Sequence, residues 1–96
     1  GPIAVQQLSQ LNFDRAFLGT NGVDCDNLTT PDIYEGAIKE TVIANSKETF
    51  ILTDSSKLEK IYFAKFARLE EVTLIINRSS KPIVNTLKDK TKVIEV

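Results

Sequence analysis

Short apolar runs alternate with polar and helix-forming segments along this chain of 96 residues, and the alternation constrains the fold more than any other feature. Apolar runs bounded by polar turns predict strands at four places: residues 14–18, 49–53, 72–76 and 93–96. Apolar residues at helical spacing and proline starts predict helices over three ranges: residues 3–11, 31–46 and 82–87. Strands that alternate with helices are typical of an α/β fold, with a mostly parallel sheet and flanking helices.

The long helix expected at residues 31–46 has a marked start. Thr30 is suited to the N-cap and Pro31 to the first helical position. Asp32 and Glu35 suit the positive end of the helix dipole. Its predicted core stripe has five members: Ile33, Ala37, Ile38, Val42 and Ile43. Residues 58–68 leave their secondary structure open, but three apolar residues there are expected in the core: Ile61, Phe63 and Phe66.

Charge and composition exclude several kinds of site. The net charge is −1 with both signs interspersed, whereas duplex DNA requires a basic face. The chain has no histidine and one cysteine, Cys25, which excludes internal disulfides, zinc sites of the usual kind and histidine-based triads. We expect no metal, no cofactor and an unreactive Cys25 thiol. Without a signal peptide or a run of ~18 apolar residues, the sequence predicts a cytoplasmic protein that does not enter membranes.

Three polar segments lie where a parallel sheet places a ligand, near the carboxyl ends of its strands. One turn follows the first predicted strand, residues 54–57 follow the second, and two threonines open the helix between them. The candidate ligand-binding residues are Gly19, Thr20, Asn21, Gly22, Thr29, Thr30 and Lys57.

The chemistry of these residues favours a small phosphorylated polyol. Glycines let backbone N–H groups approach an anion, and a helix N-terminus adds further N–H groups and partial positive charge. Lys57 offers a mobile cation, while Asn21 and the threonine hydroxyls suit sugar hydroxyls. Each feature also has a simpler explanation: a plain turn, a helix cap, a surface ion pair between Lys39 and Glu35, and a solvated Lys57. The residues alone leave both interpretations open.

In order and spacing, these motifs resemble the C-terminal sugar-phosphate-sensing domain of DeoR-family transcriptional repressors. The similar segments cover almost the whole chain: Gly-Pro-x-Ala at residues 1–4, FDRAFLGTNGVD at 13–24, LTTPDIYEGAIKETVI at 28–43 and FILTDSSKL at 50–58. The resemblance implies a phosphorylated sugar as effector and adds Lys39, an internal helical lysine, to the ligand-binding residues. It also implies a homo-oligomer that reaches operator DNA through an N-terminal winged helix-turn-helix.

The same resemblance implies a Rossmann-like fold, similar to sugar-phosphate isomerases and coenzyme A transferases, without their catalysis. Pentose-phosphate isomerases carry an acid/base glutamate where this sequence has Gly22, and glycine has no group that transfers a proton.

The sequence also departs from the family's pattern. It contains neither the family's Asp-Gly-Thr-Thr phosphate loop nor its winged helix-turn-helix, so residues 1–96 are expected to be the C-terminal half of the sensor domain. Asn77-Arg78 also replace the Thr-Asp that family members often have after the third strand. The alternative interpretations are a fragment of a sugar-phosphate isomerase and an oligomerisation half-domain without a ligand.

Overall fold

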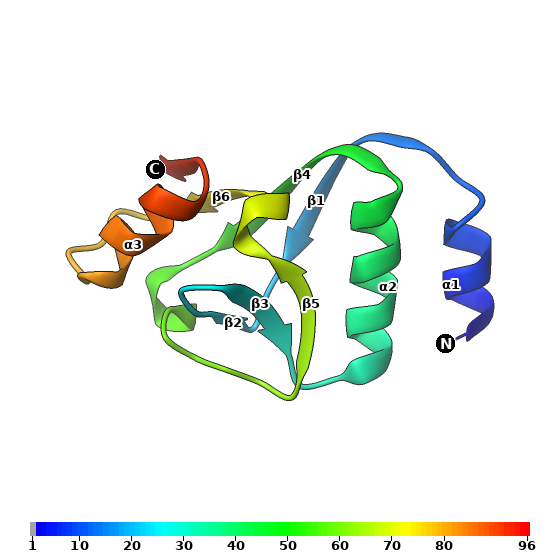
Figure 1. Ribbon diagram of the computed structural model, residues 1–96, viewed down its shortest axis with the longest axis horizontal. Coiled ribbons are helices and arrows are strands. Elements are labelled where there is room, and N and C mark those ends of the chain that lie inside the picture. Colours follow the sequence, from blue (N-terminus) through cyan, green and yellow to red (C-terminus); the bar gives the residue numbers. More distant parts are fainter. Residues whose placement is uncertain (1) are drawn as a thin grey trace.

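A four-stranded parallel sheet runs through the molecule (Figure 1). The computed structural model describes residues 2–96, so Gly1 of the Gly-Pro-x-Ala segment lies outside the described residues. The strands, in spatial order, are β1 (Phe13–Gly19), β4 (Ser46–Thr53), β6 (Thr73–Ile76) and β7 (Val93–Glu95). All three pairings are parallel, which confirms the α/β fold and the four predicted strands.

The three predicted helices are also present: α1 (Pro2–Leu8), α2 (Ile33–Ala44) and α3 (Ile83–Lys90). Helix α2 lies in the crossover between β1 and β4, and α3 lies in the crossover between β6 and β7. Helix α1 packs beside α2 at one end of the molecule (Figure 1). Among residues 2–96, no helix has the length and apolar character needed to cross a membrane.

A second, three-stranded antiparallel sheet was missed by the sequence analysis. Its strands, in spatial order, are β2 (Gly22–Val23), β3 (Asn27–Thr30) and β5 (Ala64–Arg68). The polar residues between β2 and β3 form a turn, in which Asp24 Oδ1 accepts hydrogen bonds of 2.7 Å from the backbone N–H groups of Asp26 and Asn27. Strands of two and four residues are too short to show a periodicity of their own.

The expected start of the long helix was wrong. Thr29 and Thr30 lie in β3, where pairing with β5 holds them extended. Asp32 is the N-cap of α2, and its carboxylate accepts hydrogen bonds from the backbone N–H groups of Tyr34 at 2.8 Å and Glu35 at 3.4 Å. Strand pairing therefore overrode the local preference of the threonine and proline residues.

The core lies between the parallel sheet and a layer formed by the helices and the small sheet. Its fully buried apolar residues are Val23, Leu28, Ile51, Leu69, Leu74, Ile76 and Leu87. Phe66, which lies in β5, is buried as expected. Ile61 and Phe63 were expected in the core, and this was wrong: Phe63 is 82% exposed, because both residues lie in the surface loop that precedes β5.

The buried face of α2 is rotated relative to the predicted stripe. Gly36 and Ile43 are its buried residues, whereas Ile33 and Ala37 are exposed, so their expected core positions were wrong. Two further members of the stripe are half-buried: Ile38 and Val42. Gly36 allows α2 to approach β3 and β5 closely, because a Cβ there would lie 3.3 Å from the Thr30 side chain.

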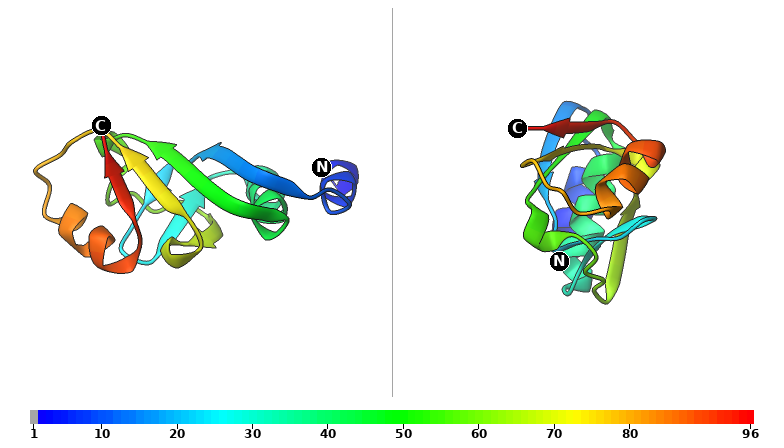
Figure 2. Two further views of the ribbon diagram at one scale, coloured as in Figure 1. Left: turned by 90° about the horizontal axis from the view of Figure 1, so that it is seen from above. Right: turned by 90° about the vertical axis from the view of Figure 1, so that its left-hand side faces the viewer.

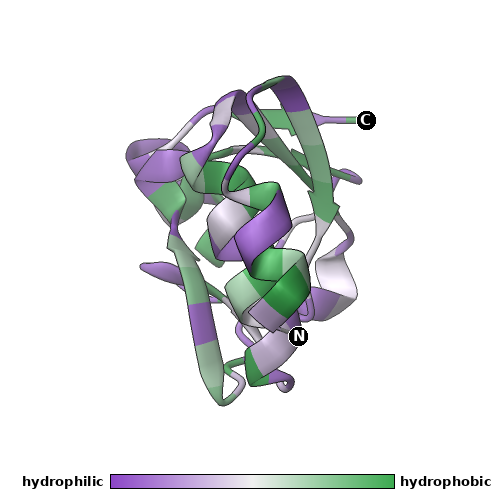
Figure 3. Ribbon diagram, turned by 90° about the vertical axis from the view of Figure 1, so that its right-hand side faces the viewer, coloured by the Kyte–Doolittle hydropathy of each residue, from purple (hydrophilic) through white to green (hydrophobic). Residues whose placement is uncertain are grey.

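One face of the parallel sheet is covered, and the other is bare (Figure 2). The parallel strands are added one after another in the same direction across the sheet. Because crossover connections between parallel strands share the same handedness, all three connections lie on the same face of the sheet. The bare face is apolar: Phe17 is 61% exposed and stacks on Phe50 with ring centroids 5.2 Å apart, and Leu52 is 49% exposed. Figure 3 shows the predominantly hydrophobic colouring of these strands. Parallel sheets usually bury both faces.

Two neighbouring residues of β4 test which face is buried in this chain. Ile51 is fully buried and Leu52 points to the bare face. We expect Ile51→Ala to lower the free energy of unfolding by about 2–5 kcal/mol, and Leu52→Ala to lower it by less than about 1.5 kcal/mol. Urea denaturation of the 96-residue chain measures both values. Equal losses would contradict the one-sided burial.

Candidate ligand site at the carboxyl edge of the parallel sheet

The carboxyl ends of β1, β4 and β6 meet at one edge of the sheet. Gly19, the last residue of β1, pairs with Leu52, and Thr53, the last residue of β4, pairs with Ile76. The segments that leave these strands therefore start side by side. This places the turn at residues 19–22 and the segment at residues 54–57 at the same edge, as the sequence analysis expected.

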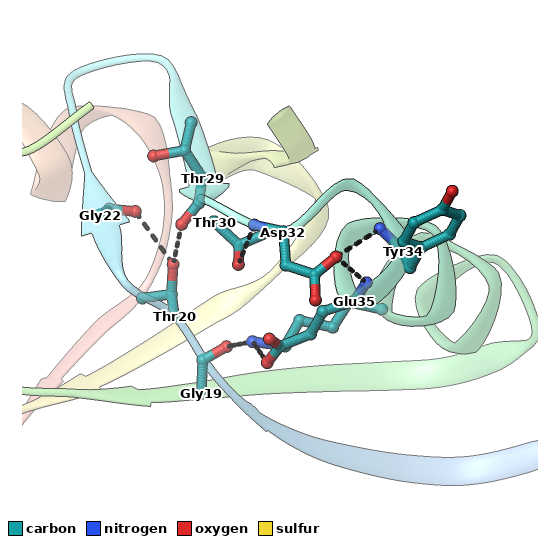
Figure 4. A network of polar contacts seen from close by, with 9 residues as sticks. Gly19, Thr20, Gly22, Thr29, Thr30, Asp32, Tyr34 and Glu35 are labelled. Atoms are coloured by element: carbon teal, nitrogen blue, oxygen red, sulfur yellow. Dashed lines mark hydrogen bonds and ion pairs between the residues drawn. The ribbon is translucent and has the colours of Figure 1, made fainter. Parts of the chain in front are cut away.

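Thr20 ties the turn after β1 to the small sheet. Its buried hydroxyl lies 2.9 Å from the carbonyl oxygen of Gly22 and 3.2 Å from that of Thr29 (Figure 4). A hydroxyl has one hydrogen to donate, and here both nearby acceptors belong to the backbone. The Thr20 side chain therefore supports the turn from inside, which leaves the backbone and Asn21 as its outer surface.

The close packing around residue 22 leaves room for glycine only. A Cβ at this position would lie 2.3 Å from the Lys60 carbonyl oxygen and 2.6 Å from Thr29 Oγ1. Real Cβ atoms do not approach backbone oxygen so closely, and the Lys60 carbonyl cannot move without shifting the loop that leads to β5. A side chain with an acid or base group therefore does not fit at residue 22 of this backbone.

Thr29 and Thr30 are fully buried beneath the turn. Thr29 Oγ1 accepts a hydrogen bond of 3.0 Å from the Tyr62 backbone N–H, and Thr30 Oγ1 accepts one of 3.5 Å from that of Asp32. The first N–H groups of α2 are satisfied by the Asp32 carboxylate, as Figure 4 shows. The helix start and both threonines thus use their polar groups within the protein.

Lys39 lies beneath the same turn, with a side chain only 12% exposed. Its Nζ donates to the Gly19 carbonyl oxygen at 2.8 Å, lies 3.2 Å from Glu35 Oε1, and sits 5.1 Å from the centroid of the Phe66 ring. The ion pair with Glu35 is present as expected, but the ammonium also holds the end of β1. A largely buried cation requires such partners, since an unpaired one is costly.

The segment after β4 forms a 3₁₀ turn, η1 (Ser55–Lys57), capped by Asp54. The Asp54 carboxylate accepts hydrogen bonds from the side chain and the backbone N–H of Ser56, and these bonds lower the pKa of Asp54 below its ordinary value. Half-buried Lys57 takes part in none of the ion pairs found among residues 2–96. Its positive charge contributes to the lowered pKa of Asp54, but no ion pair holds its ammonium in the described part of the chain.

Sequence reasoning missed two side chains that hold this segment. Asn77, the first residue after β6, accepts a hydrogen bond of 2.9 Å at Oδ1 from the Ser55 backbone N–H. Lys81 Nζ donates to the Ser55 carbonyl oxygen at 2.8 Å. The signal that could have found Asn77 is its place at the end of a strand next to β4.

Other polar and apolar features lie away from this edge. A hollow of about 260 Å³ at the amino edge of the sheet is lined by polar residues that include Thr49 and Thr73. A groove of about 410 Å³ runs between α2 and β5. The side-chain oxygen and sulfur atoms of Asp24, Cys25 and Asp26 that could hold a metal ion lie within 4.8 Å of one another. However, Asp24 caps its own turn, and Asp26 pairs with Lys90 at 3.3 Å. That pair raises the pKa of Lys90.

The fold and its polar edge define a class of protein, an α/β binding module whose loops gather at the carboxyl ends of parallel strands. Comparison with known families gives the particular family, because the pattern of the DeoR C-terminal sensor domain matches residues 1–79. The chain belongs to the DeoR C-terminal sensor domain family. This is a family of regulator sensor domains and not of enzymes, as the sequence analysis expected.

Three relatives of this chain are transcriptional regulators by name. The uncharacterized HTH-type transcriptional regulator FruR of Bacillus subtilis is 34% identical over 97% of this chain and 38% of its own length. The HTH-type transcriptional regulator GlpR of Haloferax volcanii is 40% identical over 79% of this chain and 30% of its own. The lactose phosphotransferase system repressor of Staphylococcus epidermidis is 32% identical over 97% of this chain and 35% of its own length. The chain thus spans between 30% and 38% of the length of these relatives.

The two glycines of the turn make a matched pair for testing its packing. We expect Gly22→Ala to lower the free energy of unfolding by about 1–3 kcal/mol, because its methyl group overlaps the Lys60 carbonyl oxygen. Gly19→Ala meets nothing within 4 Å and should stay within about 0.5 kcal/mol of the unaltered chain. Thermal or urea denaturation measures both values, and a neutral Gly22→Ala would show that the close packing of the turn is wrong.

Proposed function

We propose that this chain is the effector-binding part of a DeoR-type transcriptional repressor of carbohydrate catabolism, and that its effector is a phosphorylated sugar. The observation that carries the proposal is that a backbone turn and a lysine outside the ion pairs of residues 2–96 both follow strand ends at one edge of a parallel sheet. Two relatives are named for a sugar system, the lactose phosphotransferase system repressors of Staphylococcus epidermidis and Staphylococcus aureus. These names fit a sugar-derived ligand.

The proposed site contains all eight residues singled out by the sequence, in two roles. Lys57 pairs with the phosphate, while Asn21 and the backbone of the turn bind the remaining oxygen atoms. The other residues hold the turn in shape: Gly19, Thr20, Gly22, Thr29, Thr30 and Lys39. This division between residues that bind the ligand and residues that hold the turn suits a binding site, since loops already held in shape lose less conformational entropy when a ligand binds.

In this proposal the effector acts by shifting an equilibrium. The longer protein is a cytoplasmic homo-oligomer that binds operator DNA through an N-terminal winged helix-turn-helix. The phosphorylated sugar binds more tightly to the state with weak operator affinity, and that difference in affinity releases the DNA. Operator binding measured with fructose 1-phosphate, fructose 6-phosphate and tagatose 6-phosphate tests this step.

We further propose that residues 1–96 form one half of the sensor domain. The bare apolar face of the parallel sheet supports this, as does the share of about a third that the chain covers in its relatives. If another part of the longer protein covers that face, Leu52→Ala will be more destabilising in the longer protein than in the 96-residue chain. An equal cost in both proteins would speak against a covered face.

Replacing Lys57 tests the phosphate contact. We expect Lys57→Ala to remove a charge-assisted contact worth roughly 1.5–3 kcal/mol. This is an effector affinity lower by about 10- to 150-fold. Folding stability should change by only about 0.5 kcal/mol, because Lys57 is in none of the ion pairs found in the described part of the chain. Calorimetric titration of the full-length protein with the three sugar phosphates measures the affinity.

Lys92→Ala is the matched control, since it removes the same charge from an exposed residue directly before β7, at the opposite edge of the sheet. Lys39→Ala is a poor control, because its loss also breaks the contacts with Gly19 and Glu35. Unchanged affinity in Lys57→Ala would remove residues 54–57 from the site. It would favour the alternative of an oligomerisation half-domain with structural loops.

A further inference from the structure

We infer that Asn77 and Lys81 are positioning residues of the effector site, which set the place of Lys57 by clamping the peptide groups of Ser55. This rests on the proposed function, because it concerns the lysine assigned there to the phosphate. The side-chain hydrogen bonds of both residues go to Ser55, and neither was among the candidate ligand-binding residues. Their assignment comes from contacts between the ends of β4 and β6.

The clamp follows from the register of the sheet. Thr53 and Ile76 are paired as the last residues of β4 and β6, so the chain segments that follow them leave the sheet side by side. Asn77 is the next residue after β6, and its Oδ1 accepts from the Ser55 backbone N–H at 2.9 Å. These two residues are 22 positions apart in sequence, and the bond links the connection after β4 to the connection after β6.

Lys81 completes the clamp from the other side of Ser55. Its Nζ donates to the Ser55 carbonyl oxygen at 2.8 Å, so side chains hold both the N–H and the C=O of one residue. Ser55 opens the 3₁₀ turn that ends at Lys57. A turn of three residues has too few internal hydrogen bonds to hold its own orientation, so external contacts decide where the Lys57 side chain starts.

Charge supports the same assignment. Lys57 ends the short turn whose first residue is bound by Lys81, and the Asp54 carboxylate caps the turn. Asp54 is committed to Ser56 and keeps its negative charge at neutral pH, since these bonds lower its pKa. The positive charge of Lys57 also contributes to this lowered pKa, so the lysine and the carboxylate attract each other. The clamp fixes the start of the turn and so limits how far the Lys57 side chain can turn toward Asp54 and away from the edge of the sheet.

Hydrogen exchange and affinity together test the inference on the full-length protein. We expect Asn77→Ala to speed amide exchange at residues 55–57 and to lower affinity for the sugar phosphate that binds best among the three by about 2- to 12-fold, the effect of one hydrogen bond. Asn77→Asp keeps an acceptor oxygen and should restore protection of the Ser55 amide. Lys81→Gln keeps a donor without the charge and should retain more affinity than Lys81→Ala.

Matched controls away from the clamp are Asn85→Ala in α3 and Lys92→Ala, since both residues are exposed and Lys92 is in none of the ion pairs of residues 2–96. A positioning role also predicts that Asn77→Ala has no further effect on affinity when Lys57 is already alanine. Equal affinity and equal exchange in Asn77→Ala and the unaltered protein would overturn the clamp while leaving the proposed function in place. Failure of the unaltered protein to bind any of the three sugar phosphates would overturn both.

Discussion

The parallel register between β1, β4 and β6 determines where the polar parts of this molecule lie. Because Gly19 pairs with Leu52 and Thr53 pairs with Ile76, three chain segments leave the sheet at one edge. Hydrophobic burial beneath the sheet fixes this register, since Ile51 and Leu74 are fully buried and a slip by one residue would expose them. The position of the candidate site is thus a consequence of packing on the opposite side of the same strands.

At the carboxyl edge of the parallel sheet, most polar side chains bind the protein's own backbone. Thr20, Thr29 and Lys39 use their polar atoms to hold backbone, and among residues 2–96 no buried side-chain nitrogen or oxygen lacks a partner. Lys57 is different, because it takes part in no ion pair there. A rigid base with a cation at its rim that is outside the ion pairs of residues 2–96 is an arrangement suited to an anion site.

Much of this structure could be predicted from the sequence, because strong local signals agreed with the fold. The four parallel strands and three helices followed from apolar periodicity, and the motif order indicated the family. Three features depended on contacts between distant residues and were missed. Thr30 pairs with β5 as part of strand β3 and does not cap the helix. Phe63 lies exposed in the loop before β5. Asn77 accepts a hydrogen bond from the distant Ser55. Periodicity reports which face of an element is apolar, but not which partner will cover it.

The central claim is that a phosphorylated sugar binds at the carboxyl edge of the parallel sheet. The most direct measurement is the change in backbone amide NMR shifts of the full-length protein during titration with fructose 1-phosphate, fructose 6-phosphate or tagatose 6-phosphate. The account predicts that the largest changes within this segment fall at residues 19–22 and 55–57. Changes centred on the hollow at the amino edge, near Thr49 and Thr73, would contradict it.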